Sequence, residues 1–227
     1  KLVSLGFVDG YYYKPRIDIE ILEKYHEGII CLSACLAGEV NQAILNNNIE
    51  EAKKVALWFK NLFGEDYYLE VQNNGIKEQE LVNQKLVDLS RELNIPLVAT
   101  NDAHYLKKED AYNHEVLLCI QTGKKMTDED RMRFDTDELY VKSPEEMIEY
   151  FKNIPEAIEN TVKIAEKCNV EFEFGHTILP NYDVPEQYST HYDYLESLTQ
   201  AGLAKRYGQN ITKEIQDRAQ YELSVIK

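Results

Sequence analysis

The chain places a carboxylate and an imidazole two residues apart, just after a short apolar run. Residues 95–100 form a run rich in β-branched side chains, and Asp102 and His104 follow it. If the run is a buried strand, side chains two residues apart point to the same side, so the two groups lie next to each other. Such a pair can bind one metal ion or one water molecule. The spacing alone favours a structural role, in which Asp102 caps the next turn and His104 lies at a helix entrance, because Asp-x-His is common by chance.

The elements that would position this pair are a parallel sheet and its covering helices. Strand-length apolar runs occupy residues 28–33, 67–72 and 95–100. Apolar positions at helical spacing occupy residues 40–45, 49–63 and 78–93. This alternation predicts an α/β fold with a parallel sheet buried on both faces, either doubly wound or closed into a barrel.

A third ligand should lie at the same edge of the sheet, because the carboxyl ends of parallel strands gather functional residues. Cys35 follows the first strand, and Gln72 closes the second. A thiolate, an imidazole and a carboxylate together suit Zn²⁺ or a related divalent ion. Cys35 can instead serve packing or a turn. His114, beside apolar residues of a helix, is predicted to be a hydrogen-bonded core residue.

Composition limits the class of protein. The 227 residues, 44% hydrophobic and 29% charged, are ordinary for a soluble globular chain with a substantial core. No apolar run reaches the roughly 18–20 residues of a membrane span. Without a secretory leader we expect a cytoplasmic location and free cysteines. The formal net charge of −15 repels phosphate backbones, so the chain is not expected to be a main DNA-binding surface.

Helices dominate after His104. Ser143 with Pro144 and Glu146 forms a capping box that marks a helix start, and a short strand is predicted at 139–141. The Pro- and Gly-containing stretch that follows the next helix has few apolar side chains and is predicted to be a linker. The predicted organisation is a first domain at 1–174, a linker at 175–190 and a helical part at 191–227.

Several short sequence blocks, taken together, point to one protein family. They are residues 11–18, 31–39, 69–75, 99–106, 116–123, 133–134, 140–147 and 221–226. Together they resemble the alpha-subunit family of bacterial replicative DNA polymerase III, in its polymerase-and-histidinol-phosphatase (PHP) domain. The chain departs from the family at Asn74, where members often have His.

This resemblance implies a partial, irregular (β/α) barrel of the PHP type over residues 1–174 and the helical start of the polymerase palm over 191–227. It carries over Cys35, Asp102 and His104 as metal ligands for Zn²⁺ or a similar ion. The chain is expected to be an internal fragment, with the family's other ligands upstream and the catalytic carboxylates of polymerisation, with their Mg²⁺, downstream. No catalytic residue is then expected within it.

Three functions follow as hypotheses. The favoured one is a fragment of a polymerase that binds DNA, deoxynucleoside triphosphates and other replication subunits, with a PHP part resembling a phosphoesterase or exonuclease that is inactive alone. The second is a free-standing PHP phosphoesterase, against which the family-like helices after Pro185 argue. The third is a non-catalytic scaffold domain, which an acidic surface would suit.

Overall fold

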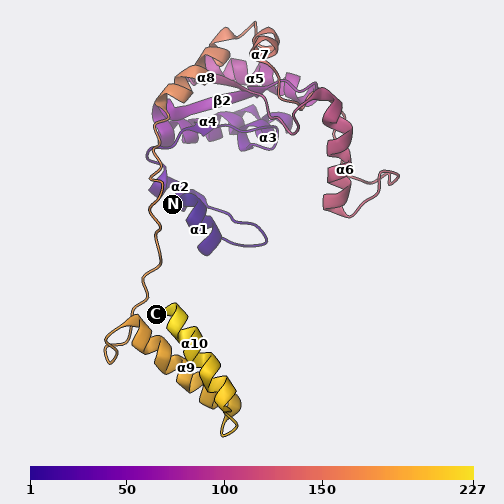
Figure 1. Ribbon diagram of the computed structural model, residues 1–227. Coiled ribbons are helices and arrows are strands. Elements are labelled where there is room, and N and C mark those ends of the chain that lie inside the picture. Colours follow the sequence, from indigo (N-terminus) through magenta and orange to yellow (C-terminus); the bar gives the residue numbers. More distant parts are fainter. The chain divides into compact units, whose positions relative to one another are not determined.

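The computed structural model describes residues 1–227, which divide into two compact units, Lys1–Val170 and Glu171–Lys227. In unit 1 the strands are β1 (Cys31–Leu32), β2 (Tyr67–Gln72) and β3 (Leu97–Thr100). Its α-helices are α1 (Leu2–Val8), α2 (Ile19–Tyr25), α3 (Glu39–Leu45), α4 (Ile49–Phe63), α5 (Lys77–Leu93), α6 (Ala111–Thr122), α7 (Pro144–Tyr150) and α8 (Pro155–Lys167) (Figure 1). Short 3₁₀ turns lie at Gly64–Asp66 and Lys108–Asp110.

The three strands of unit 1 form one parallel sheet in the order β1-β2-β3. Tyr67 pairs with Cys31 on one side of β2, while Leu69 pairs with Leu97 on the other. Every residue of β2 except Glu70 is buried, as expected for a central parallel strand. The predicted α/β class with a parallel sheet is therefore confirmed, and the sheet is open rather than closed into a barrel.

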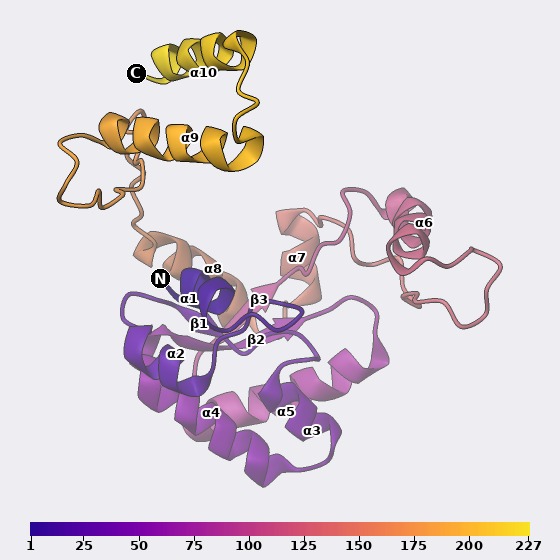
Figure 2. The same ribbon diagram turned by 90° about the horizontal axis from the view of Figure 1, so that it is seen from below.

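Helices α3, α4 and α5 lie together on one face of this sheet (Figure 2). Ala52 and Ala56 are fully buried on α4, and Leu86 is fully buried on α5. Helix α8 packs against β3, where the buried Asn160 amide donates to the Leu97 carbonyl at 2.7 Å. That hydrogen bond occupies a backbone acceptor on the outer edge of β3, which has no strand partner there.

The sequence patterns predicted the positions of most helices and strands, but the bounds of some strands differ in the structure. The strand predicted at 28–33 is reduced to Cys31–Leu32, because Gly28 and Ala34 on either side adopt left-handed φ angles of 74° and 66°. The strand predicted at 139–141 is only an isolated parallel bridge between Tyr105 and Tyr140. The sequence analysis did not predict helix α2.

Unit 2 contains α9 (His191–Tyr207) and α10 (Lys213–Ile226), in agreement with the helical part predicted at 191–227. Thr190 and Thr212 cap their N-termini by accepting hydrogen bonds from backbone N–H groups. Residues 168–190 contain no helix or strand. None of the helices is both long and apolar enough to span a membrane.

Replacing Leu69 by Ala should lower the free energy of unfolding by about 2–5 kcal/mol, because the side chain is fully buried in β2 and its loss leaves a cavity. The measurement is urea denaturation followed by circular dichroism. Leu117→Ala is the control: this side chain is 60% exposed, so its loss should cost about 0.5 kcal/mol or less. Equal losses in the two variants would contradict the assignment of β2 as the core strand.

Candidate metal-binding site

Asp102 and His104 lie side by side just beyond the carboxyl end of β3. His104 Nε2 is 3.5 Å from Asp102 Oδ1, and both side chains are partly exposed. Asp102 adopts a left-handed φ of 53°, a conformation that Asp tolerates better than most residues. The turn therefore places a carboxylate and an imidazole at one point of the surface.

The donor set of this pair fits a divalent metal ion. Zn–N and Zn–O bonds of about 2.0–2.2 Å in tetrahedral geometry separate two ligand atoms by roughly 3.3–3.5 Å. The 3.5 Å between Asp102 and His104 matches that separation. In the whole chain, however, no group of three or more His, Cys, Asp or Glu side chains is close enough to hold a metal ion. At this point the structure brings together two potential ligands, Asp102 and His104.

Cys35 is not brought to this pair. It lies in the turn after β1, where its carbonyl accepts from the buried Asn41 amide at 2.8 Å. The turn is tight: a Cβ on Gly38 would lie 2.2 Å from the Ser33 carbonyl oxygen, so only glycine fits. Because β2 lies between β1 and β3, the ends of the two outer strands are not neighbours. The role of Cys35 as a ligand stays a prediction.

Gln72, the other residue at a strand end, has a structural role. Its amide nitrogen donates to Thr100 Oγ1 at 3.1 Å, across the β2–β3 pair, and to Glu70 at 3.2 Å. Its amide oxygen accepts from Gln79 at 3.4 Å. These contacts occupy both ends of the Gln72 amide, which is 6% exposed.

The segment 136–142, which we name the clamp segment, positions the backbone of the site. The His104 N–H donates to the Leu139 carbonyl at 2.7 Å, and the Val141 N–H donates to the Tyr105 carbonyl at 3.1 Å. The Thr136 hydroxyl donates to the Asn74 carbonyl at 2.6 Å. The sequence indicated this segment only as a short strand, not as the partner of His104.

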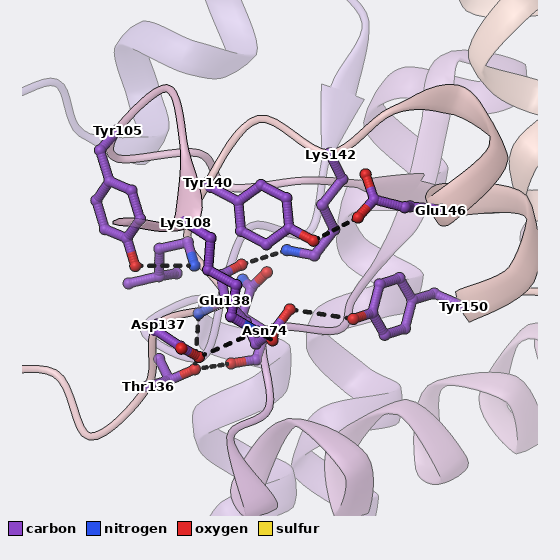
Figure 3. Close-up of polar contacts among 11 residues, drawn as sticks. Asn74, Tyr105, Lys108, Thr136, Asp137, Glu138, Tyr140, Lys142, Glu146 and Tyr150 are labelled. Atoms are coloured by element: carbon purple, nitrogen blue, oxygen red, sulfur yellow. Dashed lines mark hydrogen bonds and ion pairs between the residues drawn. The ribbon is translucent and has the colours of Figure 1, made fainter. Parts of the chain in front are cut away.

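Side chains of the clamp segment form a polar network (Figure 3). Glu138 accepts from Lys108 and from the Tyr150 hydroxyl, the latter at 3.0 Å. Lys142 is 6% exposed, donates to the Glu138 carbonyl, and lies 4.6 Å from the centre of the Tyr140 ring. Removal from water lowers the pKa of Lys142. The carbonyl and the aromatic rings together compensate this buried ammonium group.

Asn74 links the ends of β2 and β3. The residue is 1% exposed, and its side-chain nitrogen, oriented toward acceptors, donates to the carbonyls of Asn73 and Asn101 at 3.2 and 3.0 Å. The Gln79 side chain accepts from the Asn74 N–H at 2.9 Å. At this position the chain therefore uses an amide to hold the backbone directly before Asp102.

His114 differs from its predicted role. It is half-buried, and its ring packs against those of His104 and Tyr105, each at a centroid distance of 5.4 Å, in place of the predicted hydrogen bond. Burial, with a smaller contribution from the charge of His104, lowers the pKa of His114.

The first comparison with known proteins matches the first part of the chain to a domain family. A family model described as the PHP domain matches residues 1–74. That match includes β1, β2 and the turn that carries Cys35, and it ends before Asp102.

The second comparison extends over the whole chain. The DNA polymerase III subunit alpha of Borreliella burgdorferi is 52% identical over 227 residues, which are 100% of this chain and 20% of the relative. The corresponding proteins of Treponema pallidum and Campylobacter jejuni are 43% and 41% identical and are matched over 19% and 21% of their length. The chain is thus related, end to end, to a part of DNA polymerase III alpha subunits, and it spans about a fifth of their length. The resemblance predicted from the sequence blocks is confirmed.

Replacing Tyr140 by Phe should raise the pKa of Glu146 toward its ordinary value, because the Tyr140 hydroxyl donates to Glu146 Oε1 at 2.6 Å and is the main cause of its lowered pKa. A carboxylate with a lowered pKa stabilises the fold above its ordinary pKa, and this contribution is lost as pH falls through the lowered value. The wild-type chain should therefore lose more stability than the variant below about pH 4.5.

The measurement is an NMR titration of the Glu146 carboxyl carbon. Tyr150→Phe is the matched control, since Tyr150 bonds Glu138 instead and should leave the pKa of Glu146 unchanged. A Glu146 titration that is identical in the wild type and Tyr140→Phe would contradict the assignment.

Proposed function

We propose that this chain is part of a replicative DNA polymerase of the DNA polymerase III alpha type, in which its PHP region contributes to a metal-dependent phosphoesterase or exonuclease site. The observation that carries the proposal is the end-to-end similarity to polymerase alpha subunits, combined with the metal-compatible spacing of Asp102 and His104. Polymerisation itself, with its Mg²⁺ ions and carboxylates, is assigned to parts of the protein outside this chain.

In this proposal the chain has three parts. Residues 1–174 form a partial, irregular (β/α) barrel of the PHP type, residues 175–190 are a linker, and residues 191–227 begin the polymerase palm. The parallel sheet and the PHP match over residues 1–74 support the first part. The absence of helix and strand from 168 to 190 supports a linker.

The proposed metal ligands are Asp102 through a carboxylate oxygen, His104 through Nε2 and Cys35 as a thiolate, with further ligands from residues outside this chain. Bound Zn²⁺ or a similar ion would supply Lewis-acid activation of water and of a phosphoester. Asp102 would offset part of the cation's charge, while the Leu139 carbonyl fixes the His104 backbone. DNA, deoxynucleoside triphosphates and other replication subunits are the partners proposed for the whole protein, in the cytoplasm.

A scaffold role is the second candidate, and two observations favour it. No three potential ligands gather within the chain, and the net charge is −15. An acidic domain of this kind would brace the polymerase through protein contacts and would not hydrolyse phosphoesters. A free-standing PHP phosphoesterase is disfavoured, since the similarity to polymerase subunits covers the whole chain, including α9 and α10.

The test is the Zn²⁺ content of the full-length protein and its variants, measured by inductively coupled plasma mass spectrometry after dialysis. Asp102→Asn and Cys35→Ser should each retain less Zn²⁺ per protein after dialysis. Each variant removes a proposed ligand, which should lower the Zn²⁺ affinity by at least tenfold. Template-directed polymerisation should persist in both variants. Asp130→Asn, at a carboxylate that is 77% exposed, is the control and should retain the metal.

Unchanged Zn²⁺ content and unchanged phosphoesterase activity in both ligand variants would overturn the metal-site proposal. Lower stability together with unchanged metal content would instead support the scaffold candidate.

A further inference from the structure

The imidazole of His104 contacts two aromatic rings that come later in the sequence, those of His114 and Phe134. The Phe134 ring lies at a centroid distance of 5.1 Å and an angle of 88°, and the His114 ring lies at 5.4 Å and 71°. The rings of His114 and Phe134 stack on each other at 5.8 Å and 27°. His104 therefore meets both rings in edge-to-face geometry, which aromatic groups prefer.

The two rings belong to different elements, and an ion pair joins those elements. His114 lies in the first turns of α6, and Phe134 lies in the connection between α6 and α7. Arg131 Nη2 is 2.6 Å from Glu115 Oε1, and the Arg131 side chain is only 10% exposed. Arg131 Nε also donates to the Met126 carbonyl at 3.1 Å. These contacts join the residue after His114 to the segment that carries Phe134.

The backbone of His104 is fixed independently of its ring. Its N–H donates to the Leu139 carbonyl at 2.7 Å, which leaves the two side-chain torsions free to rotate. In the observed orientation His104 Nε2 faces Asp102 Oδ1 at 3.5 Å. The centroids of the Phe134 and His114 rings lie 5.1 and 5.4 Å from that of His104 and 5.8 Å from each other, so both rings contact one flank of the imidazole and oppose its rotation toward them. The orientation of the His104 ring is then set before a cation binds. Binding therefore costs less side-chain entropy and is stronger.

We propose that Phe134 and His114 are positioning residues that hold the His104 imidazole with Nε2 directed toward Asp102, ready to bind a divalent cation. This inference rests on the proposed metal site and adds two residues to it that do not touch the metal. It assigns the aromatic face of α6 and the α6–α7 connection to the site. It requires ring shape at position 114, not the imidazole nitrogens.

The test is Zn²⁺ affinity of the full-length protein, measured by competition with a chromophoric chelator, and the visible absorption spectrum of the Co²⁺ form. Phe134→Ala should weaken Zn²⁺ binding by about tenfold, the lower end of the range for residues that orient a ligand. It should also change the Co²⁺ bands, which report coordination geometry and would not respond to a loss of stability alone. His114→Phe and Phe134→Tyr retain the rings and should stay within about twofold of the wild type.

Tyr112→Ala is the matched control on the same helix, since this side chain is 65% exposed and makes no ring contact with His104. It should leave both measurements unchanged. If Phe134→Ala does not fold, Phe134→Leu replaces it, retains apolar volume without the ring and should weaken Zn²⁺ binding at least threefold.

His104→Ala separates the two possible failures. If His104→Ala lowers Zn²⁺ affinity while Phe134→Ala and Phe134→Leu match the wild type, the positioning inference is wrong and the metal site stands. If His104→Ala leaves Zn²⁺ binding unchanged, the proposed metal site fails, and the positioning inference fails with it.

Discussion

The candidate site depends on the parallel pairing of β2 with β3. The register from Leu69–Leu97 to Gln72–Thr100 ends both strands at the same level, so the residues that follow them share one edge of the sheet. Asn74 follows β2 and donates to the carbonyl of Asn101, which follows β3. The side chains of β2 are buried on both faces of the sheet, so a change of register would disrupt their packing against the helices on each side.

The backbone beyond β3 is then fixed by contacts from much later in the chain. The clamp segment supplies the Leu139 carbonyl to His104 and the Thr136 hydroxyl to Asn74. Within this segment, Glu138 accepts a hydrogen bond from the Tyr150 hydroxyl, and the Lys142 ammonium group lies over the Tyr140 ring. A buried lysine without such partners would be strongly destabilising, so the network is needed as a whole. These contacts fix the backbone of the candidate site on the β3 side.

The sequence predicted elements well where the signal was local. The strand at 67–72 and the helix at 49–63 have the predicted bounds, and the capping box at Ser143 is present. It also predicted that Asp102 and His104 lie side by side, although a turn with a left-handed φ at Asp102, not strand alternation, places them together. It did not predict the ring cluster around His104, since Phe134 lies 30 residues away and periodicity carries no information on such contacts. The sequence also did not show that β2 separates the end of β1, where Cys35 lies, from the end of β3, because periodicity does not define strand order.

The hydrogen bond from Asn160 to the Leu97 carbonyl has a consequence for synthesis of the protein. It joins residues 63 positions apart, so α8 reaches β3 only after the intervening chain has been made. At about 5–20 residues per second, that takes roughly 3–13 seconds. During this interval the outer edge of β3 lacks its helical cover and exposes backbone acceptors to any extended chain nearby. The nascent protein is therefore most prone to mispairing in this period, and mispairing ends when α8 docks.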